Sequence, residues 1–102
     1  MTLELGPQTR VRALSSVYAR PFGNELVLLD FGRGEYFALD EIATEIWLRL
    51  EAGDALATVA SRVAASHDVS ESQAFEDIMA LVRDMSARAL VETTNAESAS
   101  TE

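Results

Sequence analysis

The side chains best able to carry out chemistry are scarce in this sequence. Cysteine is absent, which excludes thiol nucleophiles, disulfides and cysteine-rich zinc sites, and His67 is the single histidine. One histidine without cysteine also disfavours a transition-metal site. His67 lies near the C-terminal end of a predicted second helix. There an imidazole typically hydrogen-bonds free carbonyl groups or interacts with the helix dipole, which is the structural role we expect for it.

Acidic residues are more numerous and cluster at two places. Asp40, Glu41 and Glu45 lie at the start of one predicted helix, and Glu76 and Asp77 lie in another. Glu41 and Glu45 share a helix face, but no neighbouring group would set one apart as an acid and the other as a base. Acidic side chains near a helix N-terminus are expected from the dipole alone. The sequence therefore predicts a protein that is not an enzyme and that uses no cofactor and no metal.

The charge of the chain bears on its partners. The net charge is −9, and all eight basic residues are arginine. Such a surface repels phosphate backbones and anionic lipid, so we expect neither nucleic acid nor membrane as a partner. It suits a partner that carries positive charge, although a solubilising surface explains it equally well. The start of the chain lacks the features of a signal peptide, and no run approaches the ~18 apolar residues of a membrane span. We expect a soluble, cytoplasmic protein.

The first half of the chain has the pattern of strands. Short apolar runs at Val17–Phe22, Leu26–Phe31 and Glu35–Leu39 are separated by glycine-containing turns, which predicts a three-stranded antiparallel meander. The second turn, Gly32-Arg33-Gly34, resembles part of a phosphate-binding loop, but it opens no helix and is interpreted as a hairpin turn. Pro21 cannot donate to a ladder, so it should lie on an edge strand or at a strand end.

The second half has the pattern of three helices, expected at Asp40–Ala52, Asp54–His67 and Ser70–Arg88. The first residue of each range is the predicted N-cap. Helices two and three resemble a helix-turn-helix pair. Trp47 falls in the apolar stripe of the first helix and is expected in the core. In the third, Ile78, Val82 and Met85 are expected to face the sheet.

These elements predict an α+β fold, a winged helix-turn-helix-like domain with a three-stranded antiparallel sheet followed by three helices. The domain should span residues 17–92. Residues 1–16 should be weakly ordered or form a short extra strand, because Val11 and Ala13 alternate with arginines. Residues 93–102 carry no large apolar side chain and are expected to form a disordered tail.

Two segments carry a resemblance to a known family. The stretches YFALDEIATEIWLRL (Tyr36–Leu50) and EDIMALVRDMSARALVE (Glu76–Glu92) resemble the PqqD-like family of recognition elements for ribosomally synthesised, post-translationally modified peptides (RiPPs). A glycine that usually precedes the last apolar pair is replaced by Ala89, so the third helix is expected to end differently. The matching residues are Leu28, Leu29, Asp30, Tyr36, Phe37, Leu39, Asp40, Ile46, Trp47, Leu50, Asp77, Ile78, Leu81, Val82, Met85, Arg88 and Leu90.

The resemblance implies a module without chemistry of its own that captures the leader region of a precursor peptide as an added strand and presents it to a modifying enzyme or leader peptidase. Freestanding members serve lasso-peptide and related pathways. Either Tyr36 or Phe37 should face away from the core, because the two alternate along one strand. Asp77 and Asp84 would meet a basic leader residue, and Arg88 an acidic one. The expected peptide-binding residues are Gly34, Glu35, Tyr36, Phe37, Ala38 and Leu39 on the third strand and Asp77, Leu81, Asp84 and Arg88 on the third helix.

Two other classes of protein remain open at this point. A winged-helix nucleic-acid-binding regulator would carry basic residues along its third helix. Residues 71–88 instead contain four acidic residues and two arginines, which argues against that class. The second class is a structural dimerisation domain without a peptide ligand. A homodimer is compatible with this hypothesis and with peptide binding.

Overall fold

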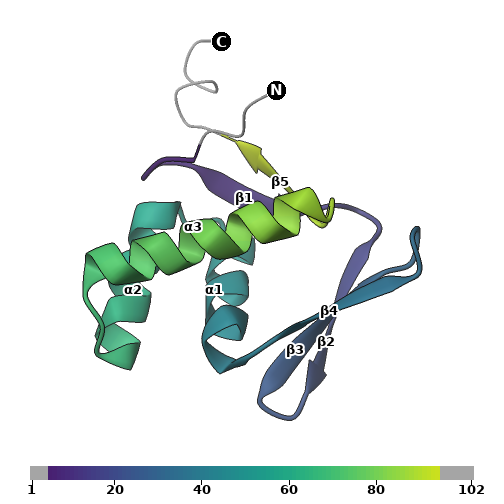
Figure 1. Cartoon of the computed structure of the whole chain (residues 1–102), viewed down its shortest axis with the longest axis horizontal. Helices are drawn as coiled ribbons and strands as arrows, with labels where there is room; N and C mark the ends of the chain where they lie inside the picture. Colours follow the sequence, from purple (N-terminus) through teal and green to yellow (C-terminus); the bar gives the residue numbers. More distant parts are fainter. Residues whose placement is uncertain (1–4, 95–102) are drawn as a thin grey trace.

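The computed structural model describes residues 5–94 (Figure 1). Its elements follow the order of four strands, three helices and a last strand. The strands are β1 (Arg10–Ala13), β2 (Val17–Phe22), β3 (Glu25–Asp30), β4 (Glu35–Leu39) and β5 (Val91–Thr94), and the helices are α1 (Glu41–Glu51), α2 (Leu56–His67) and α3 (Glu71–Ala87). The predicted α+β fold is confirmed, with a two-stranded sheet in addition. Within residues 5–94, none of the three helices combines the length and the apolar composition that a membrane span requires.

The three-stranded sheet has the order β2-β3-β4, with both pairs antiparallel. Gly23, with a φ of 67°, occupies the first position of the two-residue turn between β2 and β3, where a type II′ turn requires a left-handed backbone. The turn before β4 closes with Gly34, which has a φ of 69°. Pro21 lies on β2, an edge strand, as its missing N–H group predicts.

A second sheet joins the two ends of the described chain, where β1 pairs antiparallel with β5. It lies beside the C-terminal end of α3, apart from the larger sheet (Figure 1). Thr93 and Thr94, which we assigned to a disordered tail, are residues of β5 and pair with Val11 and Arg10. That assignment was wrong because a ladder is held by backbone hydrogen bonds and needs no large side chain. The rest of the predicted tail lies outside the described residues.

Two of the three predicted helix caps are confirmed. The Asp40 side chain accepts a hydrogen bond from the amide of Ala43, and the Ser70 side chain accepts one from the amide of Gln73. The third prediction, Asp54, is wrong: α2 begins at Leu56, and its N-cap is Ala55, without a side-chain hydrogen bond.

The chain N-terminal to β1 takes over the role of that cap. The amide of Leu56 donates to the carbonyl of Thr9 at 2.9 Å, and the amide of Ala57 donates to the carbonyl of Pro7, also at 2.9 Å. The first amides of a helix have no partner within it, so backbone carbonyls from elsewhere can satisfy them. A distant segment thus determines where α2 starts.

The end of α3 also differs from our expectation. Ala89 adopts the left-handed backbone that glycine usually provides, with a φ of 60°. The amide of Leu90 donates to the carbonyl of Met85 and that of Ala89 to the carbonyl of Ser86, which is the pair of bonds of a Schellman motif. The alanine is therefore accommodated at the cost of some backbone strain, and the helix ends as it would with glycine.

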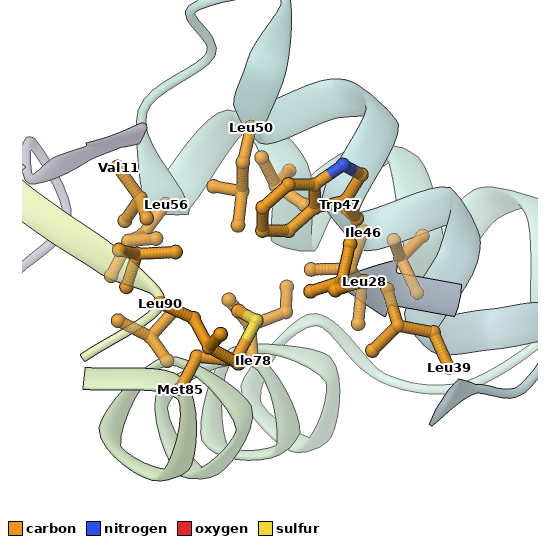
Figure 2. Close-up of a cluster of buried hydrophobic side chains, with 14 of the residues drawn as sticks. Val11, Leu28, Leu39, Ile46, Trp47, Leu50, Leu56, Ile78, Met85 and Leu90 are labelled. Carbon is orange, nitrogen blue, oxygen red and sulfur yellow. The ribbon is translucent and has the colours of Figure 1, made fainter. Parts of the chain in front are cut away.

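The core lies between the helices and the inner face of the three-stranded sheet. Trp47 of α1 packs near Leu28 of β3, with Ile78 and Met85 of α3 on the opposite side of the cluster (Figure 2). Ile78, Val82 and Met85 are fully buried, so their predicted place in the core is confirmed. This packing holds α3 against the other two helices.

Candidate functional site

The sheet leaves one edge of β4 unpaired among the described strands. The amide of Phe31 donates to the carbonyl of Ser16 on the β2 side. The direction of the backbone N–H and C=O groups alternates along a strand. These groups therefore point to β2 at the odd-numbered residues of β3 and to β4 at the even-numbered ones. In the β3–β4 register, Leu28 pairs with Phe37 and Asp30 with Glu35, so the odd-numbered residues of β4 bond to β3. Tyr36 and Ala38 are left with amide and carbonyl groups that point to the free edge.

The opposite edge of the sheet is less able to accept another strand. By the same alternation, the free-edge positions of β2 are Val17, Ala19 and Pro21. Pro21 has no N–H group, so this edge lacks one of its donors. Val17 is buried, which further limits access. Of the two edges, β4 offers the more complete set of backbone groups.

The side chains of β4 alternate between the two faces of the sheet. Phe37 is half-buried against the core and Leu39 is almost fully buried, whereas Tyr36 is 72% exposed and Ala38 is exposed. Sequence alone left open which of the two aromatic residues faces outward. The structure places Tyr36 on the outer face and Phe37 on the inner face, toward the helices.

The six predicted residues from Gly34 to Leu39 cannot all contribute in the same way. Gly34 donates its amide to the carbonyl of Asp30 at 2.8 Å, so that group is used inside the hairpin. Glu35 and Leu39 direct their backbone groups to β3, and the Leu39 side chain is part of the core. The structure therefore concentrates the edge hydrogen-bonding groups on Tyr36 and Ala38.

The predicted residues of α3 follow one side of the helix. Leu81 is half-buried and packs against the core, and Asp77, Asp84 and Arg88 are exposed. Arg88 reaches β4: its guanidinium carbon lies 4.8 Å from the centroid of the Phe37 ring. It also forms an ion pair with Asp84, with 3.2 Å between Nε and Oδ1. A cation over an aromatic face is attracted by the ring quadrupole, so this contact ties α3 to β4.

The structure does not bring Asp77 into the same cluster. Asp77 lies 11 residues before Arg88, about 16 Å along the helix axis. Its side chain accepts a hydrogen bond from Gln73 of the same helix at 3.0 Å. The cluster that joins helix and strand consists of Asp84, Arg88 and Phe37, with Leu81 one turn away.

Arg33 belongs to this region and was missed by the sequence analysis. Its Nη1 donates to the carbonyl of Arg88 at 2.9 Å, so the hairpin turn before β4 is attached to the end of α3. We interpreted Gly32-Arg33-Gly34 only as a turn. A signal was present, because a helix C-terminus leaves carbonyl groups without partners and arginine is a preferred donor to them.

His67 has a different partner from the one we expected. Its Nε2 lies 2.8 Å from Oε1 of Glu45 in α1, and Arg49 contacts the other oxygen of the same carboxylate at 3.2 Å. Burial by itself raises the pKa of Glu45. The hydrogen bonds with His67 and Arg49, and one with Ser66, outweigh burial and leave the pKa below its ordinary value of 4.5. This group links α1 to the end of α2, so its role is structural. The described residues contain no group of three His, Cys, Asp or Glu side chains placed to hold a metal ion.

Comparison with known proteins gives two kinds of similarity. The family description "Coenzyme PQQ synthesis protein D (PqqD)" matches residues 25–91. Two solved structures share the fold. "TbiB1 in Complex with the TbiA(beta) Leader Peptide" has a TM-score of 0.75 and 26% identity, over 79% of this chain and 94% of that one. "Lasso peptide synthetase B1 complexed with the leader peptide" has a TM-score of 0.74 and 29% identity, over 83% and 98%. The search of curated proteins gave no match.

Proposed function

The chain belongs to the PqqD family, and on that basis we propose that it binds the leader region of a ribosomally synthesised precursor peptide through the free edge of β4. The observation that carries this proposal is the unpaired edge of β4 beside α3, in a fold shared with two proteins whose structures contain leader peptides. The domain is a non-catalytic peptide-binding module.

The backbone of β4 supplies the first part of the recognition. Tyr36 and Ala38 each offer one amide and one carbonyl at the free edge, so an extended peptide can continue the sheet by strand addition. These bonds do not depend on the peptide sequence. They give affinity for any extended segment, and the neighbouring side chains select among sequences.

The inner side of β4, where Arg88 at the end of α3 contacts Phe37, supplies the second part. A peptide residue opposite Phe37 would point to the inner face, where Leu81 offers an apolar surface. Asp84 and Arg88 flank that position and would favour charged residues of opposite sign next to it. Asp77, further along α3, would meet a basic residue nearer one end of the peptide.

In the cell, the bound leader would be presented to an enzyme that modifies the precursor or removes the leader. The similarity to lasso peptide synthetase B1 favours a lasso-peptide or related pathway. Precursors of this kind are made on ribosomes, so we place this function in the cytoplasm.

The alternative functions receive less support. The third helix of a winged-helix regulator must approach phosphates, but α3 exposes four acidic residues against Arg83 and the C-cap residue Arg88. With a net charge of −9, the chain as a whole also repels nucleic acid. A dimerisation domain without a peptide ligand would not require a free β4 edge beside α3.

The proposal can be tested with a peptide selected for binding. An mRNA-display library of random 16-residue peptides would be selected on the immobilised chain, and the best peptide synthesised with a fluorophore. Ala38→Pro removes one amide at the free edge without removing a β3–β4 bond, and should weaken binding roughly tenfold or more. Ala19→Pro makes the same change on the free edge of β2 and should leave the affinity unchanged.

Fluorescence anisotropy measures both affinities, and circular dichroism checks that both variants are folded. Binding that is indifferent to Ala38→Pro, or weakened equally by both variants, would rule out strand addition on β4. Failure to enrich any peptide in the selection would count against peptide binding altogether.

A further inference from the structure

The outer face of the three-stranded sheet exposes an unusual amount of aromatic surface. Tyr18 is 52%, Phe22 76% and Tyr36 72% exposed, and all three lie on the face turned away from the helices. Phe31, at the end of β3, is also exposed and contacts the Tyr18 ring at a centroid distance of 5.2 Å. Contiguous apolar surface of this kind marks interaction sites on small proteins.

Part of this surface forms a row that runs across the sheet and stops at its open edge. Tyr18 pairs with Leu29, and Leu29 pairs with Tyr36, so the three side chains lie side by side on one face. Tyr36 is the last member of the row. Its backbone groups also point to the free edge, because hydrogen-bonding direction and side-chain direction alternate with the same period.

We infer that the peptide bound to β4 places an aromatic or large aliphatic side chain opposite Tyr36, on the outer face of the sheet. This inference rests on the proposed function. A strand added at about 4.8 Å from β4 brings the Cβ atom of the residue opposite Tyr36 to about 5 Å from the Cβ atom of Tyr36. An apolar side chain there continues the row of Tyr18, Leu29 and Tyr36 and removes exposed ring surface from water.

Side chains of the leader peptide are then recognised on both faces of the sheet. The peptide residue opposite Tyr36 is apolar and faces outward, and its neighbour opposite Phe37 faces inward, toward α3. The ligand class is therefore an extended peptide with large apolar residues at adjacent positions on opposite faces.

A second copy of the chain fits this surface less well. Each copy carries a net charge of −9, so bringing two sheet faces together requires work against the repulsion between them. A peptide side chain meets no such repulsion. The position of Tyr36 at the edge, next to the backbone groups that would hold the peptide, also favours the peptide as the occupant.

The test is a set of double-mutant cycles between the chain and the display-selected peptide described above. Each peptide position is changed to alanine, and affinities are measured with the wild-type chain, Tyr36→Ser and Phe37→Leu. The matched control is Phe22→Ser, which removes an equally exposed aromatic ring on the same face, two strands away from the open edge.

We expect Tyr36→Ser to weaken binding roughly 3- to 10-fold, with coupling at one peptide position. Coupling to Phe37→Leu should appear at a position an odd number of residues away, because the two side chains face opposite ways. Phe22→Ser should leave the affinity unchanged.

If Tyr36→Ser shows coupling to no peptide position while Ala38→Pro still weakens binding, this inference is overturned and the proposed function stands. If Ala38→Pro leaves the peptide affinity unchanged, both this inference and the proposed function are overturned. Concentration-dependent dimerisation in analytical ultracentrifugation, abolished by Tyr36→Ser and Phe22→Ser alike, would show instead that a second copy covers the outer face.

Discussion

The guanidinium carbon of Arg88 lies 4.8 Å from the centroid of the Phe37 ring, so the C-terminal end of α3 contacts the middle of β4. The same guanidinium pairs with Asp84 one turn earlier. Arg88 thus stands between an anion and an aromatic ring at the place where a peptide side chain would enter opposite Phe37. The charges of this pair should therefore influence which peptides bind.

Reversing these charges should change peptide affinity more than stability. Asp84→Arg and Arg88→Glu each reverse a half-exposed charge, and each should change the affinity for the selected peptide several-fold, depending on salt concentration. The unfolding free energy should fall by less than about 1 kcal/mol. Fluorescence anisotropy at two salt concentrations and urea denaturation measure the two effects.

A swap variant serves as the control for this experiment. Asp84→Arg combined with Arg88→Glu keeps the net charge and an ion pair four residues apart, but reverses its direction. If neither single change nor the swap alters affinity in folded protein, the peptide does not pass along this part of α3.

Ala89→Gly should stabilise the domain by roughly 0.5 to 1 kcal/mol. Ala89 has a φ of 60°, and a left-handed backbone costs a residue with a Cβ about 1 kcal/mol more than it costs glycine. The larger entropy of glycine in the unfolded chain offsets part of this gain. Thermal and urea denaturation provide the measurement. Ala80→Gly, at an exposed position inside α3, should instead destabilise by about 1 kcal/mol, and a loss of stability in both variants would argue against a strained backbone at Ala89.

Glu45→Gln should destabilise the domain at neutral pH but not in acid. The pKa of Glu45 in the folded protein is below 4.5, so its carboxylate contributes stability above that pH. The contribution is lost as the pH falls through the lower folded value. We expect the variant to be less stable than the wild type by roughly 1 kcal/mol at pH 7, with the difference shrinking as the pH falls below 4.5.

The control for this pH dependence is Glu51→Gln, an exposed position at the end of α1. It should show little difference from the wild type at pH 7. A difference in stability between the wild type and Glu45→Gln that stays constant as the pH falls well below 4.5 would mean that the contacts of the Glu45 carboxylate with His67 and Arg49 do not stabilise the fold.

A chain that begins at Val17, the predicted start of the domain, should fold but unfold more easily than the full chain. It lacks the carbonyls of Pro7 and Thr9, which accept from the first amides of α2, and it lacks β1 with its buried Val11. Losing these groups should lower the midpoint of urea denaturation. A chain that ends at Thr94 keeps every described contact and is the matched control. Equal stability of the two truncated chains would show that residues 5–16 add nothing to the domain.

Local sequence patterns determined much of the secondary structure of this protein and its resemblance to a family. The strand period of residues 17–39 and the helical period after Asp40 depend on side chains close in sequence, and so do the caps at Asp40 and Ser70. The family resemblance follows from the same residues, since most of them pack the core. Alternation along β4 likewise fixed that Tyr36 and Phe37 face opposite ways.

Tertiary contacts decided the rest. Alternation does not say which of Tyr36 and Phe37 faces outward, and only packing of β4 against the helices places Phe37 inside. The start of α2 depends on carbonyls of Pro7 and Thr9, almost 50 residues earlier, and the partner of His67 is on another helix. Contacts between residues far apart in sequence leave no local period or spacing, so they cannot be read from neighbouring residues. The contact between Arg88 and Phe37, which defines the candidate site, is of this kind.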